Sequence, residues 1–529
     1  MARRAVLVFG VLAALHTWPL ASAPARLSLN HNNDAELNAW ILSWVARTLP
    51  TRPAELFNGN IFAPEQGTLA YSEPLVVPAI MGAPIGWLGG SPVLTFNVVL
   101  FAGLVLTALS GWWVAWKWTG SQAGALVAGA LVAFNEHLLI RLPHTAASHL
   151  WGPPLTLYLA DRLVEAPTRR TGLLLSLVVA ATAATSVYSL ALVGVVVAAV
   201  LASGLATGRW HASAALAAWA AAGLAMAAPI LLPYVSFAMG GATRPLDIVA
   251  QFAATPAAYV TSMSRLHAGW SSVFFRDDLN VFFAGFGALL LAAVGLTMML
   301  RDRPTRRRAM AVVLVAGTGV VLSLGPNTSL YVWLYDHVPP LHGIRAPVRF
   351  GYLYLVAVGL LAGSGLAALL PRLRAGRTVA AIAALAIVTA EVAHAPIRTE
   401  PFRGLPAIYE VLGDEAVPVV LVEVPFWPPD VMHENGEYVI NATVHWRPVM
   451  NGYSGFTPMS YRDRTRSFWF FPRPGTVESM RSEGATHVMV HLERFDEVER
   501  RQVAENLDGR RDLWLIASDG DGHRLYELR

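Results

Sequence analysis

Residues 29–45 read LNHNNDAELNAWILSWV and follow the first long apolar segment of the chain. From Ala35 onward, apolar side chains recur at the spacing of one stripe along an α-helix. The stripe consists of Leu37, Trp40, Ile41, Trp44 and Val45. Two tryptophans on one stripe are typical of a helix that lies in a membrane interface. We therefore expect a helix along the membrane surface, with Asp34 and Glu36 at its N-terminal end near the lipid headgroups.

The composition around this stretch is that of a membrane protein. The 529 residues are 55% hydrophobic and 14% charged, with a mean hydropathy of +0.47. Soluble globular domains carry about 25% charged residues, so this composition excludes an ordinary soluble enzyme. The chain has no cysteine, which excludes thiol catalysis, cysteine-based zinc sites and disulfide chemistry.

The pattern of apolar segments predicts a polytopic α-helical membrane protein with about 11 transmembrane helices, each of about 20 mostly apolar residues. The segments lie near residues 5–22, 93–115, 122–140, 149–164, 171–187, 189–206, 212–233, 281–300, 309–325, 350–370 and 378–394. Short cytoplasmic loops collect Arg and Lys. With the N-terminus inside, the loops on that side hold Lys117; Arg162, Arg169 and Arg170; Arg209; Arg301, Arg303, Arg306, Arg307 and Arg308; and Arg372, Arg374 and Arg377. We therefore expect a multi-pass protein of the cytoplasmic (inner) membrane, with the C-terminus outside.

The first apolar segment has two interpretations. Ala21-Ser22-Ala23 resembles a signal-peptidase site at the end of an apolar run. We favour retention of this segment as a true first span, and cleavage would leave the remaining topology unchanged.

The composition changes at Ala395, where charges become frequent and apolar runs shorten to strand length. We expect a transmembrane domain over 1–394, with large outer loops at 23–92, 234–280 and 326–349, and a soluble extracytoplasmic α/β domain over 395–529. Residues 418–425 and 487–492 are predicted strands. Residues 476–483 and 496–506 are predicted helices, and 519–522 (DGDG) is a turn between two final strands.

Asp34 has a structural and a catalytic interpretation. An aspartate at this position caps a helix N-terminus by accepting a backbone N–H. Capping explains one carboxylate, whereas the stretch holds His31, Asn32, Asn33, Asp34 and Glu36 together. A carboxylate at a membrane interface is also placed to deprotonate an acceptor beside a lipid-linked donor. Glu36 is a second candidate, and Glu73, before Pro74 in the same loop, is a third, for acceptor or metal binding, with a solvated loop acid as its alternative.

Together these features resemble the GT-C class of integral-membrane glycosyltransferases, specifically the bacterial relatives of protein mannosyltransferases and aminoarabinose transferases. The shared features are many spans, a long first outer loop with an acid just after span one, a helix behind that acid, and a C-terminal extracytoplasmic domain. The resemblance covers roughly residues 1–395 and implies that Asp34 is the catalytic acid of the first loop. Glu73-Pro74 is the nearest match to a second acidic or His-Pro element of the family.

Two further groups lie on the outer side of the predicted topology. Arg345 and Arg349 are four residues apart where an outer loop enters a span, and the arginine fork suits a lipid phosphate; the alternative is contact with ordinary headgroups. Arg141, His144 and His149 are candidates for binding sugar or pyrophosphate, or polar residues at a helix end. Their spacing matches no zinc motif, so we assign no residue as a metal ligand.

The sequence therefore predicts a glycosyltransferase that moves a hexosyl or pentosyl group, with inversion, from a polyprenyl-phosphate sugar to a lipid, glycan or protein acceptor in cell-envelope synthesis. Membrane lipids are expected partners and nucleic acid is not. The sequence identifies no certain cofactor and leaves a divalent metal open. The alternatives are a lipid or glycan transporter (flippase) and a non-catalytic envelope-assembly protein. The nearly charge-free spans favour chemistry in the outer loops over a transmembrane path.

Overall fold

A computed structural model describes residues 2–241, 243–274 and 280–529. The chain forms two compact units. The helical unit comprises Met1–Ala23 and Val98–Arg398, and the sheet unit comprises Pro24–Asn97 and Thr399–Arg529.

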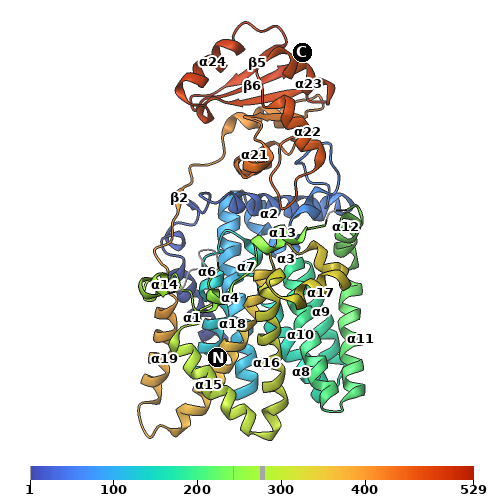
Figure 1. The fold of residues 1–529 in the computed structure, drawn as a ribbon. Helices are drawn as coiled ribbons and strands as arrows, with labels where there is room; N and C mark the ends of the chain where they lie inside the picture. The colour runs from blue at the N-terminus through green and yellow to red at the C-terminus, as the bar shows by residue number, and fades with distance from the viewer. Residues whose placement is uncertain (1, 242, 275–279) are drawn as a thin grey trace. The chain divides into compact units, whose positions relative to one another are not determined.

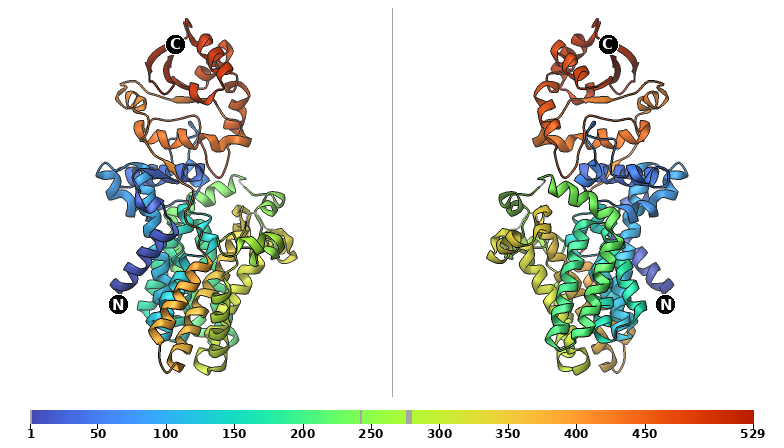
Figure 2. Two further views of the ribbon diagram at one scale, coloured as in Figure 1. Left: turned by 90° about the vertical axis from the view of Figure 1, so that its left-hand side faces the viewer. Right: turned by 90° about the vertical axis from the view of Figure 1, so that its right-hand side faces the viewer.

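The helical unit contains the long apolar helices, which run alongside one another (Figures 1 and 2). A helix overlaps each of the predicted spans. These helices are α1 (Ala2–His16), α4 (Pro92–Thr119), α5 (Gln122–Ala133), α8 (Gly152–Glu165), α9 (Arg169–Ala183), α10 (Val187–Ala206), α11 (Trp210–Met226), α15 (Phe286–Arg301), α16 (Arg303–Ser323), α18 (Tyr352–Leu369) and α19 (Arg377–Glu391). Shorter helices connect them: α6 (Glu136–Leu139), α7 (Thr145–Ser148), α12 (Ala228–Met239), α13 (Leu246–Gln251), α14 (Ala268–Phe274) and α17 (Ser329–His337).

Three stretches of the described chain are long and apolar enough to cross a membrane: Pro92–Thr119, Val187–Ala206 and Pro347–Arg372. The pair α11 and α12 passes the same test together but is bent by 79° at its joint. Helices α5 and α15 are apolar but shorter. The structure therefore has at least three candidate spans, and the larger number of spans stays a prediction.

The basic turns of the helical unit meet at one end of the bundle. Arg307 and Arg308, at the start of α16, both bond to the buried carboxylate of Asp161 on α8. Arg209, between α10 and α11, donates to the carbonyl of Val164 at 3.0 Å. The turns that the sequence assigns to the cytoplasmic side thus share one end of the unit, the lower end in Figure 1.

The sheet unit is built on a four-stranded sheet in the order β3-β4-β6-β5. Its strands are β3 (Leu421–Val424), β4 (His487–His491), β5 (Leu513–Ser518) and β6 (His523–Leu528). Strands β3 and β4 pair in parallel, and the pairings β4–β6 and β6–β5 are antiparallel. The helices after residue 399 are α20 (Glu410–Asp414), α21 (Gly436–His445), α22 (Met459–Phe468), α23 (Pro474–Ser482) and α24 (Glu497–Leu507). The predicted strands, the two predicted helices and the DGDG turn are all present.

The first outer loop joins this sheet. Strand β1 (Leu27–Ser28) pairs with β2 (Glu400–Pro401). Farther along, Val449 N donates to Asn60 O at 2.8 Å and Ala63 N to Val449 O at 2.9 Å. Met450 N donates in turn to Leu421 O on β3. Loop residues therefore extend one edge of the sheet, and compactness groups 24–97 with 399–529. This grouping reflects contacts within each unit and does not locate a membrane. The predicted boundary between a transmembrane domain and a soluble domain at residue 395 therefore stays a prediction.

Candidate active site

Asp34 lies in the first turn of α2 (Asn33–Thr51), in the sheet unit. The N-cap of this helix is Asn32, whose side-chain oxygen accepts the backbone N–H of Asp34 at 3.0 Å. The interpretation of Asp34 as the helix cap is therefore wrong, because Asn32 has that role. The half-buried carboxylate of Asp34 instead accepts the hydroxyl of Tyr453, with 2.8 Å between Tyr453 Oη and Asp34 Oδ1.

Tyr453 is brought to Asp34 by the segment 451–456 (NGYSGF), which packs on the first outer loop. A Cβ added to Gly452 would lie 2.7 Å from the ring of Phe62, and one added to Gly455 would lie 2.8 Å from the carbonyl oxygen of Tyr71. The side chain of Asn451 bonds to both the N–H and the C=O of Glu423 on β3. The close glycine contacts and the asparagine clamp hold Tyr453 in place. Sequence reasoning missed Tyr453, which lies 419 positions after Asp34.

Glu36 lies two residues after Asp34 on α2 but has a different environment. Its side chain is 6% exposed and accepts the amides of Asn30 and Asn33, at 3.2 and 3.5 Å. A Cβ on Gly436 would lie 2.5 Å from Glu36 Oε2, so the carboxyl packs directly on α21. Burial raises the pKa of Glu36 to about 8, because ionisation in this setting costs hydration. Glu36 is thus mostly protonated at neutral pH, and a catalytic role for it stays a prediction.

The apolar stripe of α2 faces protein. Trp40 is 1% exposed and donates to Asn60 Oδ1 at 2.9 Å. Trp44 is 5% exposed, donates to Leu56 O and lies 6.3 Å from the ring of Trp446. The expectation that these tryptophans anchor α2 in a membrane interface is therefore wrong: helices α3 (Val76–Trp87) and α21 pack against α2. Helical spacing reveals an apolar stripe but does not distinguish lipid from protein as its partner.

Glu73 lies in the connection between the 3-10 turn Thr68–Tyr71 and α3, where it is half-buried. Leu75, two residues later, is left-handed at φ 45° and forms the N-cap of α3. The proposed role of Glu73 in the same chemistry as Asp34 stays a prediction.

Arg345 and Arg349 lie together in the helical unit around Tyr188, in the first turn of α10. The guanidinium of Arg349 stacks 4.0 Å from the Tyr188 ring centre, and the backbone N–H of Arg345 donates to the Tyr188 hydroxyl at 3.0 Å. The guanidinium of Arg345 lies 4.8 Å from the ring centre of Phe252. Burial and the charge of Arg345 lower the pKa of Arg244, so a third arginine joins this group. Sequence reasoning missed Arg244 and Tyr188, which precede the other two by at least a hundred residues.

The remaining predicted residues also lie in the helical unit. Arg141 Nη1 is 3.0 Å from His137 Nδ1, and Arg141 Nη2 donates to Asn280 Oδ1 at 3.0 Å. His144 is the half-buried residue before α7. His149 is 1% exposed, and its Nε2 lies 3.1 Å from the carbonyl oxygen of Val99 on α4. Binding roles for these three residues stay predictions.

No protein-family model and no curated protein sequence matches the chain. Solved structures of membrane glycosyltransferases do match. The chain is similar to ArnT from Cupriavidus metallidurans bound to undecaprenyl phosphate, at 12% identity and a TM-score of 0.51, over 99% of this chain and 97% of that one. It is similar to arabinofuranosyltransferase AftD from Mycobacteria, at 17% identity and a TM-score of 0.55, over 99% of this chain but only 39% of that one.

A third similar structure is the archaeal oligosaccharyltransferase AglB from Archaeoglobus fulgidus, solved with an inhibitory peptide and a dolichol-phosphate. It has 13% identity and a TM-score of 0.50, over 93% of this chain and 69% of that one. At such low identity these similarities establish the fold alone. The three neighbours are GT-C glycosyltransferases, and the chain has the GT-C fold that its sequence resembles.

Proposed function

We propose that this protein is a membrane glycosyltransferase that transfers a sugar from a polyprenyl-phosphate donor to an extracytoplasmic acceptor in cell-envelope glycan or glycolipid synthesis. The protein resides in the inner membrane with its C-terminal residues outside. The GT-C fold and the lipid phosphates named with two of the similar structures support this class of reaction.

One observation carries the proposal: the carboxylate of Asp34 follows the first apolar helix, is not used to cap α2, and is positioned by the hydroxyl of Tyr453. In the proposed reaction Asp34 removes the proton of the acceptor hydroxyl or amine. The acceptor atom then attacks C1 of the sugar from the face opposite the lipid phosphate. The C1–O bond breaks with its electron pair on the phosphate, and the configuration at C1 inverts.

The leaving lipid phosphate needs positive charge. Arg345 and Arg349 are the proposed source, because the planar guanidinium donates two parallel hydrogen bonds to phosphate oxygens. Their packing on Phe252 and Tyr188 supports this role. A guanidinium that stacks on a ring is held in place by its face, and its N–H groups point outward in its plane, where they can donate to a phosphate. Arg141, His144 and His149 are proposed to bind the sugar or pyrophosphate.

The test is sugar transfer by the purified protein, with radiolabelled polyprenyl-phosphate sugars and an acceptor pool from membrane extract. We expect the wild type to transfer label and Asp34→Asn to be about 10²–10⁴-fold slower, the usual contribution of a general base. Undiminished transfer by Asp34→Asn would refute the role of Asp34. Lipid movement across sealed vesicles without any glycosidic bond would refute the reaction and support a transporter.

Asp496→Asn is the matched control. Asp496 caps α24 in the same unit, where its side chain accepts the N–H groups of Val498 and Glu499. Asparagine caps helices about as well as aspartate, so this variant should fold and transfer sugar normally.

A further inference from the structure

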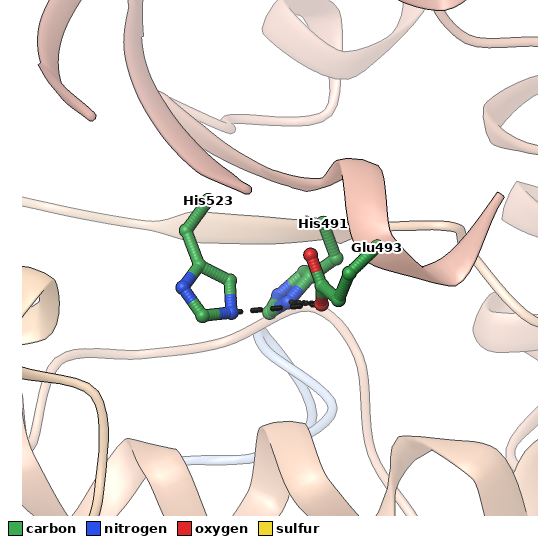
Figure 3. Close-up of side chains that lie close together, drawn as sticks. All are labelled: His491, Glu493 and His523. Atoms are coloured by element: carbon green, nitrogen blue, oxygen red, sulfur yellow. Dashed lines mark hydrogen bonds and ion pairs between the residues drawn. The ribbon is translucent and has the colours of Figure 1, made fainter. Parts of the chain in front are cut away.

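A histidine and carboxylate cluster lies on the sheet, at the start of β6. His491 ends β4 and His523 begins β6, and the two face each other as partners across the antiparallel pair. Glu493 lies in the 3-10 turn Leu492–Arg494 that follows β4. Figure 3 shows its carboxylate between the two imidazole rings, with contacts to both. Among the described residues this is the one group of three such side chains whose ligand atoms all lie within 4.8 Å of one another.

We propose that His491, Glu493 and His523 form a binding site for one divalent metal ion of the zinc class. The site is separate from the proposed sugar-transfer residues and does not depend on them.

The distances between the ligand atoms suit a metal ion. His491 Nδ1 and His523 Nε2 lie 3.1 and 3.5 Å from Glu493 Oε1. Tetrahedral ligands at zinc, with bonds of about 2.0–2.2 Å, lie about 3.3–3.6 Å apart. The contact at 3.5 Å is long for a hydrogen bond between these groups. Two histidines and one carboxylate are also a ligand set that zinc uses, with a water molecule in the fourth position.

The second nitrogen of each ring is held by its own carboxylate. His491 Nε2 lies 2.8 Å from Glu423 Oε2, and His523 Nδ1 lies 2.6 Å from Asp519 Oδ2. Metal-binding histidines characteristically donate their other N–H to a carboxylate, which fixes the tautomer and aims the ligand nitrogen at the metal. In this cluster both histidines direct the remaining nitrogen toward Glu493.

These outer carboxylates are fixed as well. Both oxygens of Glu423 accept the hydroxyl of Tyr409, at 3.0 and 3.1 Å, and Glu423 is fully buried. Asp519 accepts the backbone N–H groups of Asp521 and His523. The turn itself needs Gly522, at φ 103°, where an added Cβ would lie 3.4 Å from Glu493 Oε2. The fold thus places the cluster with an outer layer already in position, while Glu493 remains 32% exposed for entry of an ion.

The experiment is metal binding by the full chain, purified through a tag without histidine and stripped with EDTA. ZnCl₂ is titrated by calorimetry, bound zinc is counted by elemental analysis, and Co²⁺ is added as a visible-absorption probe. We expect one zinc per chain, a higher thermal unfolding temperature with zinc, and cobalt absorption bands of low coordination number.

Two ligand variants and two controls decide the outcome. Glu493→Gln and His523→Gln should weaken zinc binding at least about 100-fold, more than the 10–100-fold typical of outer residues. His433→Gln removes a half-exposed histidine beside Glu434 and should bind zinc normally, as should Asp34→Asn. Equal unfolding temperatures of variants and wild type in EDTA would show that the variants fold. Absence of zinc binding by the wild type, or normal binding by both ligand variants, would overturn the proposal.

Discussion

Two buried carboxylates show how differently this chain treats the same functional group. In the helical unit, Asp161 is fully buried and bonds to both Arg307 and Arg308. In the sheet unit, Glu36 is buried against α21 and accepts the side-chain amides of Asn30 and Asn33. The two arginines compensate the buried charge of Asp161. For Glu36, the loss of hydration on burial outweighs the attraction of the Arg494 charge, and its pKa rises to about 8.

We interpret the difference as one between a structural carboxylate and a carboxyl group that is protonated in the folded protein. A buried carboxylate bonded to two arginines of a neighbouring helix joins the two helices, and removing it leaves uncompensated charge. Asp34, in the same helical turn as Glu36, accepts the hydroxyl of Tyr453, and its role in proton transfer stays a prediction. We therefore expect proton transfer at the first turn of α2, and we expect Asp161 at the basic end of the helical unit to stabilise the fold.

The largest effect is expected at Asp161. Replacing it with alanine leaves two arginines without their shared partner, and breaking a buried ion pair typically costs about 3–5 kcal/mol of stability. Chemical unfolding of the detergent-solubilised protein measures this loss. Asp302→Asn, at the exposed N-cap of α16 on the same end, should cost less than about 1 kcal/mol, because asparagine caps helices about as well as aspartate. Sugar transfer per folded molecule should not change, and a transfer defect would place Asp161 in the chemistry instead.

The second effect concerns Arg345 and Arg349, which stack on Phe252 and on Tyr188 in the first turn of α10. Arg345→Gln and Arg349→Gln should each raise the KM for the lipid-phosphate donor by about 10–100-fold, the value of a hydrogen bond to a charged group at about 1.5–3 kcal/mol. Steady-state kinetics with varied donor measures this. Arg301→Gln, on the exposed last turn of α15, is the control and should leave KM unchanged. An unchanged donor KM in both variants would exclude these arginines as the phosphate site.

The sequence predicted the helical part of this molecule well. An apolar run is a local property, so each predicted span contains or overlaps a helix, and the DGDG turn and its strands follow from local preferences too. The position of Asp34 after the first apolar helix was likewise readable from the sequence.

The residues that surround the candidate site could not be predicted from the sequence. Tyr453 and Asp34 are 419 positions apart, and Asn60 and Val449 are joined only through the fold. The tryptophan stripe of α2 showed the same limit, since its partner α21 lies almost four hundred residues later. Spacing along one helix defines a face, whereas contacts between distant segments depend on how the whole unit packs.

The third prediction tests the charge of Glu36 through pH. Its pKa is raised in the folded protein, so between the unfolded value near 4.5 and about 8 the folded state holds a proton that the unfolded state has released. Stability should therefore fall as pH rises through this window, by up to about 1.4 kcal/mol per pH unit. Glu36→Gln should flatten that slope and be the more stable protein at pH 7.5. Thermal unfolding from pH 5.5 to 8 measures it.

Glu55→Gln is the control for this experiment. Glu55 lies in the same loop but is half-exposed and pairs with Arg52, so its removal should leave the wild-type slope. A Glu36→Gln protein with the same pH slope as the wild type would show that Glu36 is charged when folded, and the contrast with Asp161 would fail.

The smallest effect is expected at Tyr453, which distinguishes positioning from catalysis. Tyr453→Phe keeps the ring on the loop and removes the hydroxyl that donates to Asp34, at a cost of about 1 kcal/mol, or a five-fold fall in kcat. Because that hydrogen bond favours the charged carboxylate, its loss should also move the acidic limb of the pH–rate profile to higher pH. Tyr158→Phe, whose ring packs on Trp113 in the helical unit, should change neither quantity. A fall in kcat without a shift of the acidic limb would mean that Tyr453 supports the loop and not the proton transfer.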